Sequence, residues 1–284
     1  VFIDNKKVVK YFSNSNKSIA RIDRTKYLNG TVPKVTYMND NMYSHEFVDG
    51  ELLSDVTDSK VFTSFLNFCN DRFFSKRFKK DTAFLSNCKL MYETKTRKRV
   101  VGFAGSALDG IEKINDISVP KIKVLLNNID WNRVYDIAIP VLFHGDLQPG
   151  NILYNNAENS FTLIDWRESF GSSLEVGDIY YDLSKLYHAS IIGNQTVKDN
   201  LFEYEIVDGV AKVDYYIQSN LFEFLQVLKG FCEVNGFDWN NIELLGILHY
   251  INISTLYNDF RGGRYGEFLF LLGKYLLTQH LKYN

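Results

Sequence analysis

Two short motifs near the middle of the chain constrain its fold most. Residues 144–151 read His-Gly-Asp-Leu-Gln-Pro-Gly-Asn, and Leu163-Ile-Asp-Trp166 ends a short apolar run. The flanking apolar stretches predict three short strands, the last two forming a hairpin: residues 139–143, 152–154 and 161–164. We therefore expect Asp146, Asn151 and Asp165 to lie close together at the ends of rigid elements.

These three side chains have the chemistry that phosphoryl transfer needs. Asp146 can accept a hydrogen bond from a substrate hydroxyl, and Asn151 and Asp165 offer the hard oxygen ligands that Mg²⁺ prefers. Phosphate oxygens and water would complete the octahedron of the metal. A His-Gly-Asp turn or a Leu-Ile-Asp strand end is common alone, but the pair in this order and spacing is not.

The composition is that of a globular protein with two lobes. The chain has 284 residues, of which 45% are hydrophobic and 23% are charged, and its net charge of −2 gives no general attraction to nucleic acid. Cys69, Cys88 and Cys232 are odd in number and form no CxxC pair, so a disulfide framework or a zinc site is not expected. We expect a cytoplasmic protein without a membrane span or a secretory signal.

The pattern of elements predicts an α+β fold. A small β-rich N-terminal lobe, residues 1–49, would bind the nucleotide, and a larger, mainly helical lobe, residues 50–284, would hold the catalytic and acceptor sites. Strands are expected at residues 1–3, 7–12, 32–37 and 42–48. Helices are expected at residues 17–28, 59–74, 120–129, 179–191, 214–235, 240–260 and 265–282. The stretch from 75 to 110 has no readable periodicity.

The motifs resemble those of the aminoglycoside phosphotransferase and choline kinase family, the small-molecule branch of the protein-kinase-like fold. The matching pieces are residues 144–151, residues 163–166 and Gly177-Asp-Ile-Tyr-Tyr-Asp-Leu183, which is similar to the family's Gly-Asp-x-x-x-Asp-Leu segment. The resemblance implies a two-lobed kinase that uses ATP and Mg²⁺, with Asp146 as the catalytic residue and Asn151 and Asp165 as metal ligands.

The resemblance also assigns roles outside these motifs. Lys10 resembles the strand lysine that holds the ATP phosphates, and the backbone of Glu46, Phe47 and Val48 would contact adenine. Asp178 would brace the catalytic loop, His144 would pack within it, and Asp182 would either support it or contact the substrate.

The N-terminal part departs from the family pattern in two ways. Residues 13–30 contain no Glu to pair with Lys10, and Asp23 is the one acidic residue there. A glycine-rich loop would have to precede Val1, so we expect the chain to be a fragment, with a fused or associated biosynthetic domain upstream as one option.

Several functions agree with this pattern. The first is phosphorylation of a hydroxyl on a small polar acceptor, in particular a sugar, because residues 178–188 are similar to kinase-like domains of bacterial surface-polysaccharide (capsule) synthesis. An amino alcohol such as choline is the second acceptor and an aminoglycoside the third. The alternative is a nucleotide-binding pseudokinase or scaffolding domain, which the two departures from the family favour.

Two groups of residues could select the acceptor. The basic clusters 76–80 and 95–99 are either solvated faces or a docking strip for an anionic acceptor such as a phosphorylated sugar. Five aromatic residues either pack in the core or stack on a sugar or a quaternary ammonium group: Trp166, Tyr180, Tyr181, Tyr187 and Tyr250.

Overall fold

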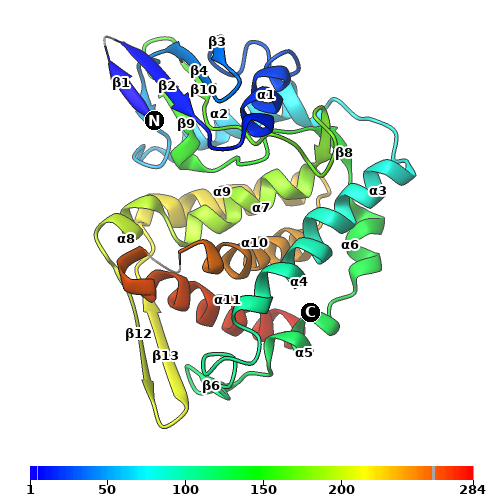
Figure 1. The fold of residues 1–284 in the computed structure, drawn as a ribbon, viewed down its shortest axis with the longest axis vertical. Coiled ribbons are helices and arrows are strands. Elements are labelled where there is room, and N and C mark those ends of the chain that lie inside the picture. The colour runs from blue at the N-terminus through cyan, green and yellow to red at the C-terminus, as the bar shows by residue number, and fades with distance from the viewer. Residues whose placement is uncertain (5, 258–259, 284) are drawn as a thin grey trace.

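The computed structural model describes residues 1–4, 6–257 and 260–283 and shows a small β-rich lobe above a larger helical lobe (Figure 1). The upper lobe contains a four-stranded antiparallel sheet in the order β1-β2-β4-β3. Its elements are β1 (Phe2–Asp4), β2 (Lys7–Tyr11), α1 (Ser15–Arg24), β3 (Val35–Asn39) and β4 (Met42–Glu46). The predicted α+β fold is confirmed, and the boundary expected near residue 49 stays a prediction.

Strand β2 carries Lys10 into the interior. Its side chains alternate between the two faces of the sheet, so Val8 and Lys10 are buried while Lys7 and Tyr11 are exposed. Helix α1 begins at Ser15 because the Asn14 side chain caps it, accepting a hydrogen bond from Asn16 N at 3.0 Å. This helix ends at Arg24, four residues before the end predicted from the sequence.

Two further sheets flank the motif at 144–151. The order β10-β9-β5 joins β9 (Ile152–Asn155) and β10 (Ser160–Leu163), the predicted hairpin, to β5 (Glu51–Leu52). The predicted strand before the motif is β8 (Pro140–Leu142), which pairs with β11 (Val176–Asp178). The motif therefore begins and ends on paired strands, which fixes both of its ends.

The helical lobe is built around α7 (Ile179–Ile191), α10 (Trp239–Ser254) and α11 (Arg264–Tyr283), which pack side by side (Figure 1). The other α-helices are α2 (Ser59–Cys69), α3 (Thr82–Lys89), α4 (Lys95–Arg99), α5 (Ile122–Asn127), α6 (Trp131–Ile137), α8 (Asn194–Lys198) and α9 (Ser219–Val234). A π-helical turn, Asn70–Phe74, extends α2, and another, Leu90–Thr94, joins α3 to α4. Short 3₁₀ turns occur at Val100–Gly102, Pro149–Asn151, Thr255–Tyr257 and Phe260–Gly263.

The sequence prediction fails at two places in this lobe. Residues 82–102, inside the stretch without readable periodicity, form a continuous helical path. The π turn at Leu90–Thr94 has i→i+5 hydrogen bonds, and this interrupts the apolar spacing of an α-helix. The helix predicted over 214–235 is wrong at its start, since α9 begins at Ser219 and is preceded by a hairpin of β12 (Phe202–Val207) and β13 (Val210–Tyr215).

This hairpin had a signal in the sequence. Asp208-Gly209 separates two runs of alternating residues, and both residues adopt positive φ, 50° and 77°, as a two-residue hairpin turn requires. Strand β13 also pairs in parallel with β6 (Lys113–Ile114), which in turn pairs with β7 (Ile117–Ser118). Among the described residues, no helix is long and apolar enough to cross a membrane.

The contact between α7 and α10 is tight enough to exclude a methyl group at one position. A Cβ on Gly246 of α10 would lie 2.3 Å from Cδ1 of Tyr187 on α7, so we expect Gly246→Ala to lower the free energy of unfolding by about 1–3 kcal/mol. In the matched control, Gly230→Ala on α9, the new Cβ meets nothing within 4 Å. Better helix propensity should there raise stability by up to about 1 kcal/mol. Urea denaturation of both variants checks this, and equal effects would contradict it.

Candidate active site

The motif at 144–151 places Asp146 and Asn151 in direct contact. Asn151 Nδ2 donates to the backbone oxygen of Asp146 at 2.9 Å and to its Oδ2 at 3.1 Å. Because the amide nitrogen is used in this way, the amide oxygen of Asn151 is the atom left to meet a cation. The loop thus fixes the spacing between a carboxylate and an amide oxygen that the sequence predicted.

Asp146 has a second partner that sequence reasoning missed. Lys185 on α7 places its Nζ 3.0 Å from Asp146 Oδ1, and both lie in a largely enclosed part of the site. Burial alone would raise the pKa of Asp146, but the nearby ammonium of Lys185 outweighs it and holds the pKa below its usual value. Asp146 is therefore ionised and able to accept a hydrogen bond from a hydroxyl. Lys185 lies two residues after the Asp-Leu that ends the third motif, and nothing in that spacing indicated its contact.

His144 packs in the interior and is neutral. It is fully buried, and burial lowers its pKa to about 4. Its Nδ1 accepts a hydrogen bond from Asp146 N at 3.3 Å, which leaves the proton on Nε2. A neutral ring that is used for loop packing agrees with the supporting role expected of this residue.

The Asp182 side chain binds the backbone of the loop at 144–151. Its two carboxylate oxygens accept hydrogen bonds from His144 N and Gly145 N, both at 2.7 Å. Burial raises the pKa of Asp182 to about 7, and these two amides and Arg24 oppose the shift. Gly145 has φ of 89°, and a Cβ there would lie 2.6 Å from Cβ of Arg167, so the turn requires glycine.

Asp178 joins α7 to the strand that enters the loop. It caps α7 by accepting from Tyr180 N at 3.2 Å, and it also accepts from Ile139 N at 2.9 Å and from the Tyr92 hydroxyl at 2.7 Å. Burial raises its pKa to about 6 against these donors. All three donors belong to the protein itself, and this agrees with the supporting role expected of Asp178.

Arg24 is the second residue that the sequence did not reveal. Its guanidinium is fully buried at the end of α1 and donates to four backbone carbonyls, those of Phe143, His144, Arg167 and Leu174. It also lies over the Phe143 ring, 3.9 Å from the centroid. Burial lowers its pKa to about 9, so it is still charged near neutral pH. One side chain of the upper lobe thereby holds both loops that carry the predicted site.

Lys10 and Asp165 also meet across the two lobes. The Lys10 ammonium forms an ion pair with Asp165 Oδ1, and Lys10 is buried while Asp165 is partly open to solvent. Asp165 has φ of 59°, so the end of β10 turns sharply at this residue. Asp23, the acidic residue considered for this pair, is exposed on α1.

The donor set suits Mg²⁺ bound together with phosphates. Asn151 and Asp165 lie on neighbouring segments, joined by a hydrogen bond from Ile164 N to Asn151 O at 2.9 Å. An amide oxygen and a carboxylate are hard ligands, and Mg²⁺ sites at phosphates use one or two carboxylates with water and substrate oxygens. Among the described residues, no group of three or more His, Cys, Asp or Glu side chains could hold a metal, so a cation here would depend on the phosphates.

Glu46 ends β4, an inner strand of the upper sheet, and Phe47 and Val48 follow it. Glu46 and Phe47 are exposed and Val48 is half-buried. Phe47 N donates to Lys6 O at 2.6 Å within the sheet, and Glu46 O lies 2.7 Å from His45 Nδ1. Of the three residues predicted to contact adenine, Val48 is thus the best placed to use its backbone.

A cavity of about 530 Å³ opens beside Asp146. It is lined by residues of α4, α7, α8 and α10, by residues that follow Asp165, and by Leu256, Tyr257, Phe260 and Tyr265. Lys95 and Arg99 of the second basic cluster line it, whereas the cluster at 76–80 does not. Of the five aromatic residues considered for acceptor binding, Tyr181 lines the cavity and the other four are buried in the core.

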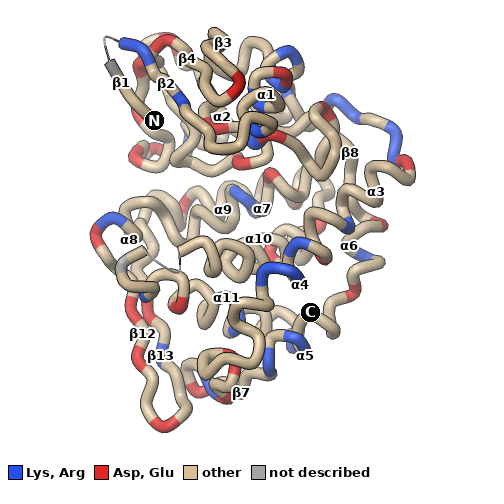
Figure 2. The backbone as a smooth tube through the Cα atoms, in the orientation of Figure 1, with Lys and Arg blue, Asp and Glu red and all other residues tan. Residues whose placement is uncertain are grey.

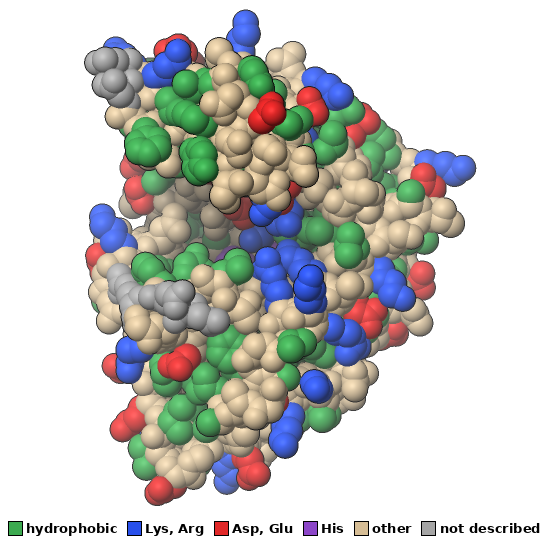
Figure 3. All heavy atoms as spheres, in the orientation of Figure 1, with side chains coloured by type: hydrophobic (Ala, Val, Ile, Leu, Met, Phe, Trp, Pro, Cys, Tyr) green, Lys and Arg blue, Asp and Glu red, His purple; other side chains and the backbone are tan. Residues whose placement is uncertain are grey.

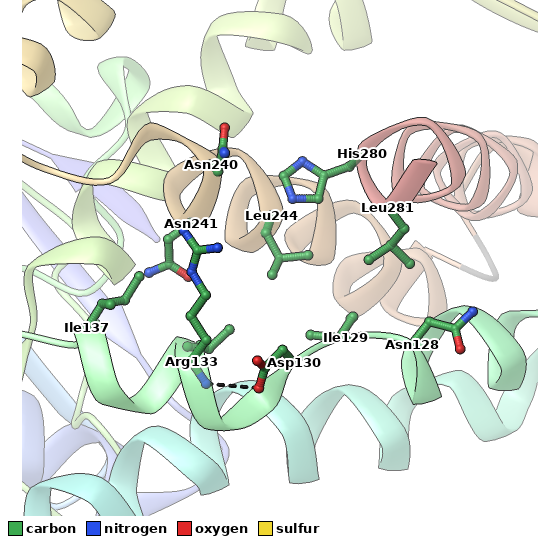
Figure 4. A pocket seen from close by; sticks show the side chains of 11 residues that line it. Asn128, Ile129, Asp130, Arg133, Ile137, Asn240, Asn241, Leu244, His280 and Leu281 are labelled. Atoms are coloured by element: carbon green, nitrogen blue, oxygen red, sulfur yellow. Dashed lines mark hydrogen bonds between the residues drawn. The ribbon is translucent and has the colours of Figure 1, made fainter. Parts of the chain in front are cut away.

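A second, smaller cavity of about 210 Å³ lies between α6, α10 and α11, far along the helical lobe (Figure 4). Arg133, Asn241 and His280 point into it, and Arg133 N donates to Asp130 Oδ1 at 3.1 Å. None of the residues predicted for the site lines this cavity, so the cavity beside Asp146 is the candidate active site.

Comparisons with known proteins agree with this assignment. Residues 129–216, which contain all three motifs, match the family described as "Phosphotransferase enzyme family". None of the curated proteins matches the chain. The match confirms the predicted resemblance to the aminoglycoside phosphotransferase and choline kinase family and the predicted enzyme class, a phosphotransferase.

A solved structure with a TM-score above 0.5 confirms the two-lobed, kinase-like fold. A putative fructosamine-3-kinase from Thermobifida fusca YX-ER1 is 13% identical with a TM-score of 0.55, over 96% of this chain and 85% of that chain. A choline kinase from Cryptosporidium parvum Iowa II is 12% identical with a TM-score of 0.42, over 93% of this chain and 75% of that chain.

We expect Arg24 to contribute more to the free energy of unfolding than an exposed arginine does. Arg24→Met leaves four buried carbonyls without their charged donor, so we expect the free energy of unfolding to fall by at least about 3 kcal/mol. The control is Arg133→Met, which removes an exposed ion pair with Asp238 and should cost no more than about 1 kcal/mol. Chemical denaturation measures both, and similar losses would argue against the role of Arg24.

Tyr181 should ionise at unusually low pH. Burial opposes ionisation of its phenol, but Arg167, Lys95 and Lys185 outweigh burial and lower its pKa to about 8. We expect the near-ultraviolet phenolate absorbance to rise by one tyrosine as the pH passes about 8 in the native protein. Tyr181→Phe should lose this step, and superimposable titration curves would refute the assignment.

Proposed function

Because the catalytic core is that of a phosphotransferase, we propose that the chain phosphorylates a hydroxyl of a small polar metabolite with ATP and Mg²⁺. The observation that carries this proposal is the arrangement of Asp146, Asn151 and Asp165 at one place, with the Lys10 ammonium on Asp165. Phosphoryl transfer depends on positioning and charge stabilisation, and this arrangement can supply both.

Each residue has a role that follows from its contacts. Asp146, ionised and held by Lys185 and Asn151, accepts the hydrogen bond of the acceptor hydroxyl and orients its oxygen. Asn151 and Asp165 would hold Mg²⁺, which would supply positive charge to neutralise the phosphates. Lys10 holds the nucleotide phosphates, and the backbone near Val48 receives the adenine.

The bonds, the electron pair and the proton of this reaction are all accounted for by ATP, the acceptor hydroxyl and Asp146. The hydroxyl oxygen forms a bond to the γ-phosphorus of ATP while the bond from that phosphorus to the bridging oxygen breaks, and ADP leaves with the electron pair. The hydroxyl proton passes to Asp146 and from there to solvent. Lys185, 3.0 Å from Asp146, offsets negative charge beside the transferred group.

We further propose a sugar or sugar derivative as the acceptor, used in bacterial surface-polysaccharide (capsule) metabolism in the cytoplasm. The similarity of residues 178–188 to kinase-like domains of such pathways supports this. The cavity volume of about 530 Å³ lies within the range of pockets that enclose a small ligand. Choline or another amino alcohol is a weaker candidate. Tyr181, Tyr257 and Tyr265 line the cavity, but Arg and Lys side chains line it as well and would repel a cationic acceptor.

A nucleotide-binding pseudokinase, or a scaffolding domain of a larger biosynthetic protein, is the second candidate. The observation that favours it is the partner of Lys10, which is Asp165 and not a carboxylate of α1. An ammonium bound to the metal-ligand carboxylate has to be released when Mg²⁺ and phosphate enter.

Replacing the predicted catalytic carboxylate separates the two candidates. Asp146→Asn should reduce turnover at least about 100-fold, because the amide cannot take up the proton, while calorimetry should show Mg·ATP binding nearly as tight as in the unchanged protein. The matched control is Asp23→Asn, on the exposed side of α1, which should leave both quantities unchanged.

The assay is release of ADP over a panel of sugars, sugar derivatives and amino alcohols. ADP release by the unchanged chain that persists in Asp146→Asn would sink the proposed mechanism. Binding of Mg·ATP without ADP release on any acceptor of the panel would favour the pseudokinase.

A further inference from the structure

The cavity beside Asp146 is strongly basic. Among the described residues that line it, two carboxylates face six cationic side chains, namely Arg21, Lys95, Arg99, Arg167, Lys185 and Lys198. Figure 3 shows Lys and Arg side chains gathered where the hollow between the two lobes opens, and Figure 2 places basic residues on α4 and α7 at that level. The chain as a whole has a net charge of −2, so this excess is local.

Both carboxylates already have partners. Asp146 pairs with Lys185 at 3.0 Å, and Glu168 lies 3.6 Å from Arg21 and 4.0 Å from Arg167. In the part of the chain that the structure describes, neither Lys95 nor Arg99 has an ion pair with a carboxylate. These two side chains, four residues apart on α4, therefore line the same cavity without an opposite charge.

The Lys and Arg side chains that line the cavity repel one another when no ligand is bound. Burial lowers the pKa of Lys95 to about 8, and the positive charges of Arg167, Arg99 and Lys185 add to that effect while Tyr181 opposes it. Lys95 lies 5.7 Å from the centre of the Tyr181 ring, and Arg167 donates to the Tyr181 hydroxyl at 3.5 Å. An anion between Lys95, Arg99 and Arg167 would relieve this repulsion.

Buried polar atoms of the lining also lack hydrogen-bond partners among the described residues. They are Arg21 Nε, His188 Nδ1 and Asn252 Oδ1. Buried atoms without partners cost free energy, and this cost falls on residues that line the cavity.

The cavity lies on the acceptor side of the candidate active site. Asp146 lines it, but Lys10, Asn151 and Asp165 do not, and neither do Glu46, Phe47 and Val48. The cations of α4 therefore face a molecule that approaches Asp146 from the helical lobe, separate from the nucleotide phosphates.

We propose that the acceptor of this phosphotransferase carries an anionic group, a phosphate or a carboxylate, which binds to Lys95, Arg99 and Arg167 while its hydroxyl meets Asp146. The inference rests on the proposed function, whose acceptor class it narrows to an anionic sugar. Guanidinium groups suit such a ligand because their planar donors pair with two oxygens of a phosphate or carboxylate. A cationic acceptor such as an amino alcohol would meet repulsion in the same place.

Matched acceptors test the charge of the substrate. We would measure ADP release with a neutral hexose, its monophosphate, the corresponding uronic acid, a nucleoside-diphosphate hexose and an amino alcohol, all with Mg·ATP. We expect kcat/KM for at least one anionic acceptor to exceed that for the neutral hexose roughly tenfold or more. The monophosphate, diphosphate and carboxylate arms show which anion the site takes.

Variants of α4 locate the anion site. Lys95→Gln and Arg99→Gln should each raise KM for the anionic acceptor roughly tenfold or more and leave KM for ATP unchanged. The matched control is Lys98→Gln, an exposed lysine of the same helix outside the cavity, which should behave as the unchanged protein. Arg99 donates to Asn252 O at 2.8 Å, so Lys95→Gln is the variant that least disturbs packing.

A binding measurement separates failure of this proposal from failure of the proposed function. Calorimetry with inorganic phosphate should show binding to the unchanged chain and to Lys98→Gln, weakened in Lys95→Gln, whether or not ADP is released. Equal phosphate binding in all variants, no binding, or preference for the neutral or amino acceptor would overturn the anionic site. Phosphate binding that depends on Lys95 without ADP release on any acceptor would preserve the site and reject the kinase.

Discussion

The loop at 144–151 is held between a buried guanidinium group and a buried carboxyl group. Arg24 donates to the carbonyls of Phe143 and His144, and Asp182 accepts from the amides of His144 and Gly145. The loop leaves its sheet after β8, so these backbone groups have no strand to pair with, and buried groups without partners cost about 1–3 kcal/mol each. Two side chains thus do what a neighbouring strand does elsewhere, and the position of Asp146 depends on both.

This arrangement also connects the lobes. Arg24 ends a helix of the upper lobe, whereas Asp182 belongs to α7, the helix that also carries Tyr181 and Lys185. The ion pair between Lys10 and Asp165 is a second link between the lobes. The upper lobe lacks a helix glutamate for Lys10, but it contributes a buried arginine that fixes the loops around the site. Its contribution to the site therefore includes the geometry of these loops.

Local patterns in the sequence predicted the parts of the molecule whose causes are local. The loop at 144–151, the hairpin of β9 and β10 and the helix α7 all follow from short-range spacing. Arg24 and Lys185 could not be found in this way, because their partners lie more than a hundred and nearly forty positions away along the chain. The roles of Lys10 and of residues 46–48, and the boundary near residue 49, stay predictions.

The helical path of residues 82–102 has a consequence for how such a chain can change over evolutionary time. It supplies Lys95 and Arg99 to the cavity but none of the side chains on the nucleotide side. Substitutions on the helical face that lines the cavity can therefore change the shape and charge of its wall while Asp146, Asn151 and Asp165 keep their places. Such changes can be made one residue at a time, because each leaves the loops that carry those three side chains intact.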